Sequence, residues 1–127
     1  MQMAFQRIRG IIGSWRLVAT HAVDDHGRPM PAPYGPQPQG IVVFSADGRM
    51  MAVLCDGRAR LPAGEIIREF SSYCGNFTFD GEQLVTLVDA SSNPGWVGGE
   101  QVRAVRFAGE CLMLKNGNRS LVWERLA

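Results

Sequence analysis

The side chain best suited to acid–base chemistry in this sequence is His21, near the end of a strand-like segment. Residues two apart in a strand share a face, so His21 is in phase with Trp15 and Leu17, the evident core residues of the segment. A regular strand therefore points this imidazole inward, as a general base or as a polar contact for a ligand. The structural alternative is an inert hydrogen-bonded histidine, or one turned outward by a bulge.

A second candidate is Arg103, in the segment from Gln101 to Phe107. It alternates with Val102 and Ala104 and shares a face with Val105, which favours an inward guanidinium. An interior guanidinium keeps its proton, so it needs a carboxylate, carbonyl groups or an anionic ligand to offset desolvation. The sequence leaves an internal ion pair and an anchor for a ligand carboxylate or enolate equally open.

Three aromatic residues are candidates for the wall of an apolar pocket. Tyr73 is followed in phase by Phe77 and Phe79, Trp96 follows a turn, and Tyr34 lies in a proline-rich segment. Aromatic rings of this kind line ligand pockets and also fill cores. We predict that Tyr34, Tyr73 and Trp96, with His21 and Arg103, bind a ligand, and that a catalytic group, if there is one, is among His21, Arg103 and Tyr73.

Motifs for other chemistries are missing from the sequence. No G-x-S-x-G elbow, P-loop or G-x-G-x-x-G occurs, so hydrolase, nucleotidase and dinucleotide-binding functions lack their signatures. Two histidines and three scattered cysteines give no usual metal-ligand spacing. We expect no metal ion and no cofactor.

These candidates are positioned by strand-length apolar segments separated by turn residues. Turns such as Asp47-Gly48 and Asp80-Gly81 suit tight hairpins. A sheet of about eight strands can close into a barrel and enclose one small ligand. The predicted strands are residues 12–23, 40–45, 49–55, 73–79, 83–90, 101–107, 111–115 and 120–126.

Two segments differ from this pattern. Residues 62–70 place Ile66, Ile67 and Phe70 at helical spacing, which predicts a short helix. Residues 29–39 hold five of the seven prolines and cannot pair centrally in a sheet. The predicted fold class is all-β, a closed antiparallel up-and-down barrel with one short helix, in a single domain over residues 1–127.

Composition and charge exclude several partners. The 127 residues carry a formal net charge of +1 without a basic stripe, which argues against nucleic acid. No segment reaches membrane-spanning length, and the N-terminal residues lack the apolar run of a secretory signal. We expect a cytoplasmic protein that contacts neither nucleic acid nor membrane.

Several motifs together resemble a known family. Gly13-Ser14-Trp15 is similar to the G-x-W signature of lipocalins and related calycins. With further motifs it resembles the bacterial and fungal lipocalin-like domain family over nearly the whole chain: residues 73–77, 93–98, 101–103 and 123–125. The resemblance implies that Arg125 packs over Trp15 to close one end of the barrel, and that the proline-rich segment is a lid at the other.

Three functional hypotheses remain open from the sequence. The first is binding of a small hydrophobic or amphipathic metabolite in the barrel. The second is a cofactor-independent isomerase, cyclase or dehydratase for a ketide-like or terpenoid-like molecule, with His21 as base and Arg103 or Tyr73 stabilising an enolate. The third is a barrel filled by its own side chains that works through its surface as a homodimer.

Overall fold

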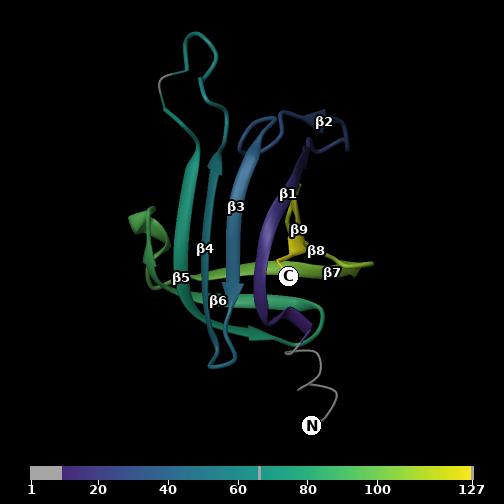
Figure 1. The fold of residues 1–127 in the computed structure, drawn as a ribbon, viewed down its shortest axis with the longest axis vertical. Helices are drawn as coiled ribbons and strands as arrows, with labels where there is room; N and C mark the ends of the chain where they lie inside the picture. Colours follow the sequence, from purple (N-terminus) through teal and green to yellow (C-terminus); the bar gives the residue numbers. More distant parts are fainter. Residues whose placement is uncertain (1–9, 66, 127) are drawn as a thin grey trace.

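The computed structural model describes residues 10–65 and 67–126, which form a closed antiparallel barrel (Figure 1). Its elements are β1 (Gly13–Val23), β2 (Pro29–Met30), β3 (Pro38–Phe44), β4 (Arg49–Asp56), β5 (Phe70–Phe79), β6 (Gln83–Ser91), η1 (Pro94–Trp96), β7 (Glu100–Ala108), β8 (Cys111–Asn116) and β9 (Arg119–Arg125). From β3 onward each strand pairs with the next along the chain, and β1 pairs with both β3 and β9. The predicted barrel is confirmed, with the two-residue β2 added beside β1.

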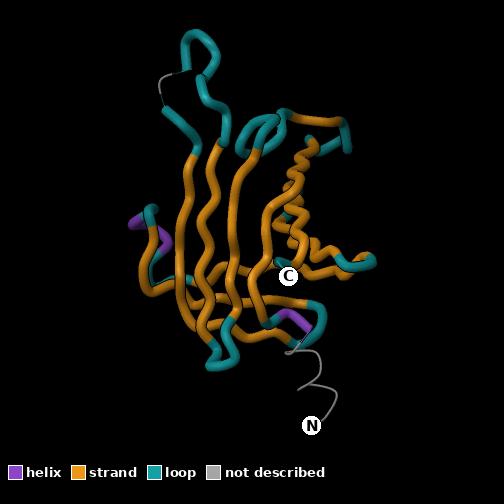
Figure 2. The backbone as a smooth tube through the Cα atoms, viewed as in Figure 1, coloured by secondary structure: helices purple, strands orange, loops and turns teal. Residues whose placement is uncertain are grey.

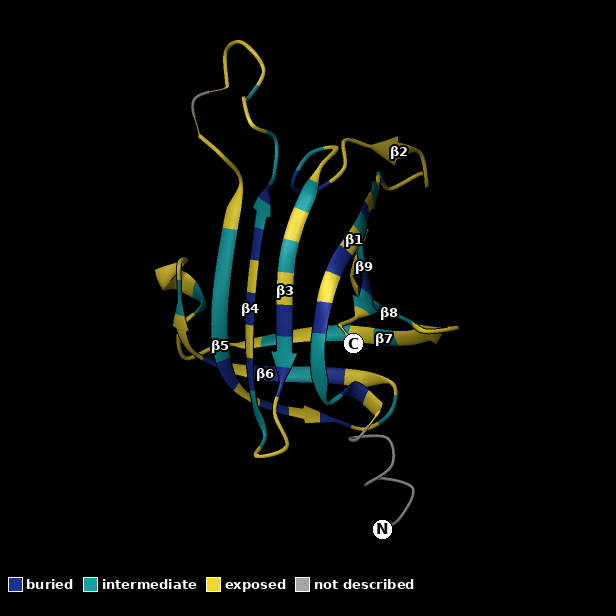
Figure 3. Cartoon of the chain, in the orientation of Figure 1, coloured by how far each residue is buried: buried dark blue, intermediate teal, exposed yellow. Residues whose placement is uncertain are grey.

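Alternating burial along the strands shows why the chain closes in this way. On β4, Met50, Ala52 and Leu54 are buried, whereas Met51 and Val53 between them are exposed (Figure 3). This period of two gives each strand one apolar face. Closing the sheet turns all of those faces toward a common interior.

One end of the barrel is closed by Trp15 and Arg125. The guanidinium carbon of Arg125 lies 4.1 Å from the centre of the Trp15 ring, and its nitrogens donate to the carbonyls of Ile12 and Gly10. The backbone at Gly13 has φ +130°, and a Cβ there would lie 2.6 Å from Arg125 Nη1. The lack of a side chain at Gly13 therefore leaves the space that the Arg125 guanidinium occupies. The packing of Arg125 over Trp15 that the family resemblance implies is confirmed.

Aromatic side chains fill the interior next to this closed end. Phe44 and Phe77 meet edge to face with ring centres 5.2 Å apart, and Phe79 lies 6.2 Å from Phe107. Phe77 and Phe79 are buried core residues. Core packing is therefore the role of both phenylalanines.

The predicted helix over residues 62–70 is wrong. Its described residues form turns and bends, and Phe70 already begins β5; Ile66 lies outside the described residues. The Glu65 N–H does bond to the Pro62 carbonyl, but Gly64 adopts φ +93°, and a left-handed residue ends a right-handed turn.

The described residues contain no helix that is long and apolar enough to cross a membrane.

Two loops meet at the open end of the barrel, the proline-rich loop (residues 31–37) and the β4–β5 loop (residues 57–69) (Figure 2). The Thr20 hydroxyl donates to the Pro33 carbonyl at 2.6 Å, and the Tyr34 N–H donates to Glu69 Oε2 at 2.9 Å. The Gly57 N–H donates to the Gln37 carbonyl at 2.7 Å. These bonds fix the proline-rich loop over the end of the barrel.

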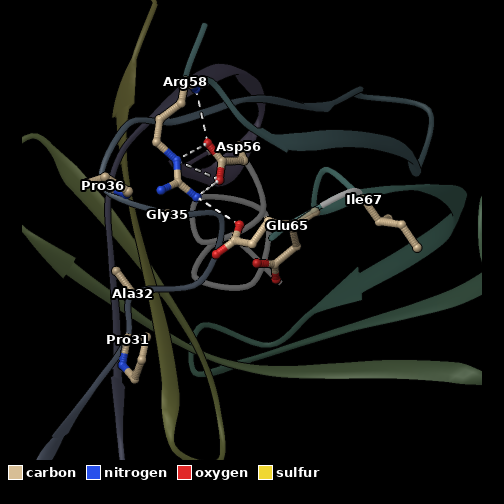
Figure 4. A pocket seen from close by; sticks show the side chains of 9 residues that line it. Pro31, Ala32, Gly35, Pro36, Asp56, Arg58, Glu65 and Ile67 are labelled. Carbon is tan, nitrogen blue, oxygen red and sulfur yellow. Dashed lines mark hydrogen bonds and ion pairs between the residues drawn. The ribbon is translucent and has the colours of Figure 1, made fainter. Parts of the chain in front are cut away.

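An ion pair between Asp56, the last residue of β4, and Arg58 in the β4–β5 loop lies beside the proline-rich loop (Figure 4). The buried Asp56 carboxylate accepts hydrogen bonds from Arg58 Nη2 at 2.6 Å, from Arg58 Nε and from the Arg58 backbone N–H. A Cβ at Gly35 would lie 2.5 Å from Asp56 Oδ2. The absence of a side chain at Gly35 therefore lets the proline-rich loop lie against this carboxylate.

Gly75 offers a direct test of the β5–β6 pairing. A Cβ at this residue would lie 1.9 Å from the Leu87 carbonyl oxygen, a backbone atom that cannot move aside cheaply. We expect Gly75→Ala to lower the free energy of unfolding by about 2–3 kcal/mol through overpacking, and the melting temperature by several degrees. Gly99→Ala is the control, because its Cβ would meet nothing closer than 3.5 Å; equal melting temperatures for the two variants would contradict the packing described.

The ion pair between Asp56 and Arg58 predicts a pH dependence of stability. The Arg58 hydrogen bonds lower the pKa of Asp56, so the folded state holds this carboxylate ionised more strongly than the unfolded chain does. Its contribution is present above the ordinary carboxyl pKa of about 4 and is lost as pH falls through the lowered value. We expect Asp56→Asn to melt below the parent protein at neutral pH, with the gap narrowing in acid.

Melting curves of both proteins between neutral and acidic pH test this. Asp25→Asn changes an exposed turn carboxylate and serves as the matched control, with little difference expected at any pH. If the difference in melting temperature between Asp56→Asn and the parent protein stays constant or widens in acid, Asp56 does not have the lowered pKa described.

Candidate functional site

A pocket of about 220 Å³ opens at the end of the barrel beneath the proline-rich loop. Its walls combine apolar and aromatic side chains with two arginines and two amides. They come from the proline-rich loop, η1, β7, β8 and β9: Pro33, Tyr34, Trp96, Gln101, Arg103, Leu114, Asn116, Arg119 and Leu121. We call this the mouth pocket.

Arg103 faces the mouth pocket, as its phase on β7 predicts. Its guanidinium donates to the Gln101 side-chain oxygen and to the Val102 carbonyl, both at 2.8 Å. Among the described residues no carboxylate lies within ion-pair distance of it. The internal ion pair that the sequence left open is thus not formed by the described part of the chain.

Trp96 forms one side of the mouth pocket, and Tyr73 supports it from behind. Trp96 lines it and packs edge to face on Tyr73, with ring centres 5.9 Å apart at 88°. Tyr73 is not part of the lining itself but holds the indole in place. Burial raises the pKa of Tyr73, and the Arg103 charge only partly opposes this, so its hydroxyl is a neutral hydrogen-bond donor at neutral pH.

Tyr34 reaches the mouth pocket from the proline-rich loop through a strained backbone. Its φ of 63° is the one positive value at a non-glycine position in the described residues, a conformation that costs energy and clusters at functional sites. Its backbone is held by Glu69, and its hydroxyl donates to Ser71 Oγ at 2.8 Å. Burial is the main cause that raises the pKa of Tyr34.

His21 does not reach the mouth pocket, and the prediction that it points inward is wrong. The β1–β9 register shifts between Leu17 and Ala19, so the inward phase passes from Leu17 to Thr20, which is buried, while His21 is exposed. A bulge inserts one extra residue and reverses the side of every side chain after it. The bulge that the sequence left open as an alternative is the one observed.

Three polar wall residues were not predicted from the sequence: Gln101, Asn116 and Arg119. Arg119 lies two residues from Leu121 and four from Trp123 on β9, so all three side chains share the inner face of the strand. The Arg119 guanidinium lies 3.8 Å from Glu69, with both side chains about half exposed. The phase of Trp123 was therefore the signal that would have found Arg119.

A larger hollow of about 640 Å³ lies outside the barrel, between the proline-rich loop and the β4–β5 loop (Figure 4). Its buried charged residue, Asp56, is already saturated by Arg58, which also lies 3.5 Å from Glu65. Asp56 and Arg58, two of the charged residues that line this hollow, thus already have protein partners. The mouth pocket, which holds a guanidinium without a carboxylate, is the better candidate.

The described lining of the mouth pocket holds no side chain that is a ready base at neutral pH. Its described lining contains neither a carboxylate nor an imidazole, and burial raises the pKa values of Tyr34 and of the neighbouring Tyr73, so both hydroxyls stay protonated at neutral pH. No group of three histidine, cysteine, aspartate or glutamate side chains in the described residues is arranged to hold a metal ion. What the walls offer is hydrogen-bond donors above an apolar floor.

Comparisons with known proteins agree with this architecture. The family model described as lipocalin-like domain matches residues 12–125. The crystal structure of an uncharacterized protein from Bacteroides eggerthii DSM 20697 superimposes with a TM-score of 0.52 at 12% identity, covering 91% of this chain and 99% of that one. No curated protein matches. Because the family model spans nearly the whole barrel, the chain belongs to the lipocalin-like domain family.

Proposed function

We propose that this protein binds one small amphipathic molecule in the mouth pocket. The molecule's apolar part lies against Trp96, Leu114 and Leu121, and its polar end faces Arg103. The observation that carries the proposal is the Arg103 guanidinium, which faces this pocket without a carboxylate partner among the described residues. The guanidinium has more N–H donors than its bonds to Gln101 and Val102 use, so it can also pair with an acceptor on a ligand.

The pocket's size supports a single small ligand. An apolar cavity of about 150 Å³ is enough for benzene, and the mouth pocket measures about 220 Å³. The space suits one ring with a short polar chain. The aromatic packing toward the closed end supports this limit, because Phe44, Phe77 and Phe79 already occupy the interior there.

Binding is better supported than an isomerase, cyclase or dehydratase activity. That mechanism assigned His21 as the base, and His21 is exposed outside the mouth pocket. Arg103 and Tyr73 remain in or beside the pocket, but both would stabilise charge rather than remove a proton. A filled barrel acting only through its surface leaves the open pocket and its guanidinium without a role.

Nuclear magnetic resonance of the tryptophan indole groups tests the proposed site. We expect 3-phenylpropanamide and 3-phenylpropanoate, two probes of one size, to produce a saturable shift of the Trp96 indole signal, identified by Trp96→Phe. The Trp15 indole is the internal reference, because it donates to the Ile11 carbonyl at the closed end and should not move.

A matched pair of variants on β7 completes the test. Gln101→Phe places a ring in the mouth pocket, whereas Val102→Phe adds the same ring on the exposed face. We expect the first variant to weaken binding of both probes by roughly tenfold or more, the effect of about 1.4 kcal/mol, and the second to leave it unchanged. If neither probe moves the Trp96 signal, or if Gln101→Phe binds as well as the parent, the mouth pocket is not the binding site.

A further inference from the structure

We infer that the ligand of the mouth pocket is an anion, a small amphipathic carboxylate recognised by Arg103 together with Arg119. This rests on the proposed function and adds the chemical class of the ligand. Arg119 carries no role in the predictions from sequence. The inference follows from the charges and hydrogen bonds of the pocket wall.

The wall of the mouth pocket is positively charged. Two guanidinium groups line it, and its described residues include no carboxylate to balance them. Glu69 is the one carboxylate of the described residues within ion-pair distance of either group, at 3.8 Å from Arg119. Beside the apolar side chains of the pocket, this excess charge attracts an anion more strongly than it would on a fully exposed surface.

Hydrogen-bond donors also outnumber acceptors in this region. The guanidinium of Arg103 uses only Gln101 and Val102 as acceptors, fewer than its N–H groups can reach. The hydroxyl of Tyr73 makes no hydrogen bond to a described residue, although the Arg103 charge acts on it. A carboxylate accepts several hydrogen bonds and pairs with a guanidinium fork, so it matches this donor surplus.

Glu69 lies beside the mouth pocket, between the proline-rich loop and Arg119. One of its oxygens accepts the Tyr34 N–H at 2.9 Å, and the other is the oxygen near Arg119. The Glu69 and Arg119 side chains are 43% and 58% exposed, so their attraction is weak. An entering carboxylate can therefore replace Glu69 at Arg119 while Glu69 keeps its bond to the proline-rich loop.

Isothermal titration calorimetry with the same two probes tests the charge preference. They differ in charge but hardly in size, since 3-phenylpropanoate is anionic at neutral pH and 3-phenylpropanamide is neutral. We expect the carboxylate to bind roughly tenfold or more tightly than the amide, as charge-assisted hydrogen bonds require. Equal affinities for the two probes overturn the anion inference and leave the proposed function standing, whereas binding of neither probe overturns both.

Charge variants separate recognition by these two arginines from general attraction. Arg103→Gln and the more exposed Arg119→Gln should each reduce carboxylate affinity several-fold while amide affinity stays within about twofold. Arg106→Gln removes an equal charge from the exposed face of β7 and should change neither. Glu69→Gln keeps an acceptor for the Tyr34 N–H and should raise carboxylate affinity. A carboxylate preference that survives in both Arg103→Gln and Arg119→Gln overturns the inference.

Discussion

The pairing of β1 with β9 is the constraint on which the rest of this structure depends. Without it the sheet has two open edges and its apolar face has nothing to pack against. With it, every inward side chain from Trp15 to Trp123 shares one interior. The register shift between Leu17 and Ala19 in this same pairing then decides which half of β1 faces inward. It places Thr20 under the proline-rich loop, where its hydroxyl holds Pro33.

The closed barrel divides its interior between an aromatic core and the mouth pocket. Toward the closed end the space is taken by Trp15, Phe44, Phe77 and Phe79, which are all buried. Toward the open end Leu114 and Leu121 form a floor, and polar groups from β7 and β9 rise above it. The aromatic core and the proposed binding site thus lie toward different ends of the same strands. A substitution at the mouth should therefore change binding more than it changes folding.

Much of the fold could be predicted from the sequence because a two-residue period is a local signal. It correctly predicted the eight long strands, the barrel and the inward face of Arg103, but not the two-residue β2. It failed for His21 because a bulge depends on how β1 meets β9, a partner about 100 residues away. The helix predicted over residues 62–70 failed because one glycine at positive φ outweighs an apolar spacing.

The composition of the mouth pocket was predictable only in part. Tyr34, Trp96 and Arg103 were expected there, but which of them would meet depended on the path of the proline-rich loop, and that path is set by Thr20, Asp56 and Glu69. The missing carboxylate partner of Arg103 could not be predicted at all, because an ion pair can join residues at any sequence separation. Because no described carboxylate pairs with Arg103, we infer that the pocket takes a ligand with a carboxylate of its own.

The most direct test of the central claim is native mass spectrometry of the protein purified from its own organism, compared with the same sample after denaturation. The account predicts that denaturation releases one small acidic molecule that fits about 220 Å³, and that Gln101→Phe, produced in the same cells, carries much less of it. A released molecule that is cationic or far too large for the mouth pocket, or one that Gln101→Phe retains at full occupancy, would contradict it.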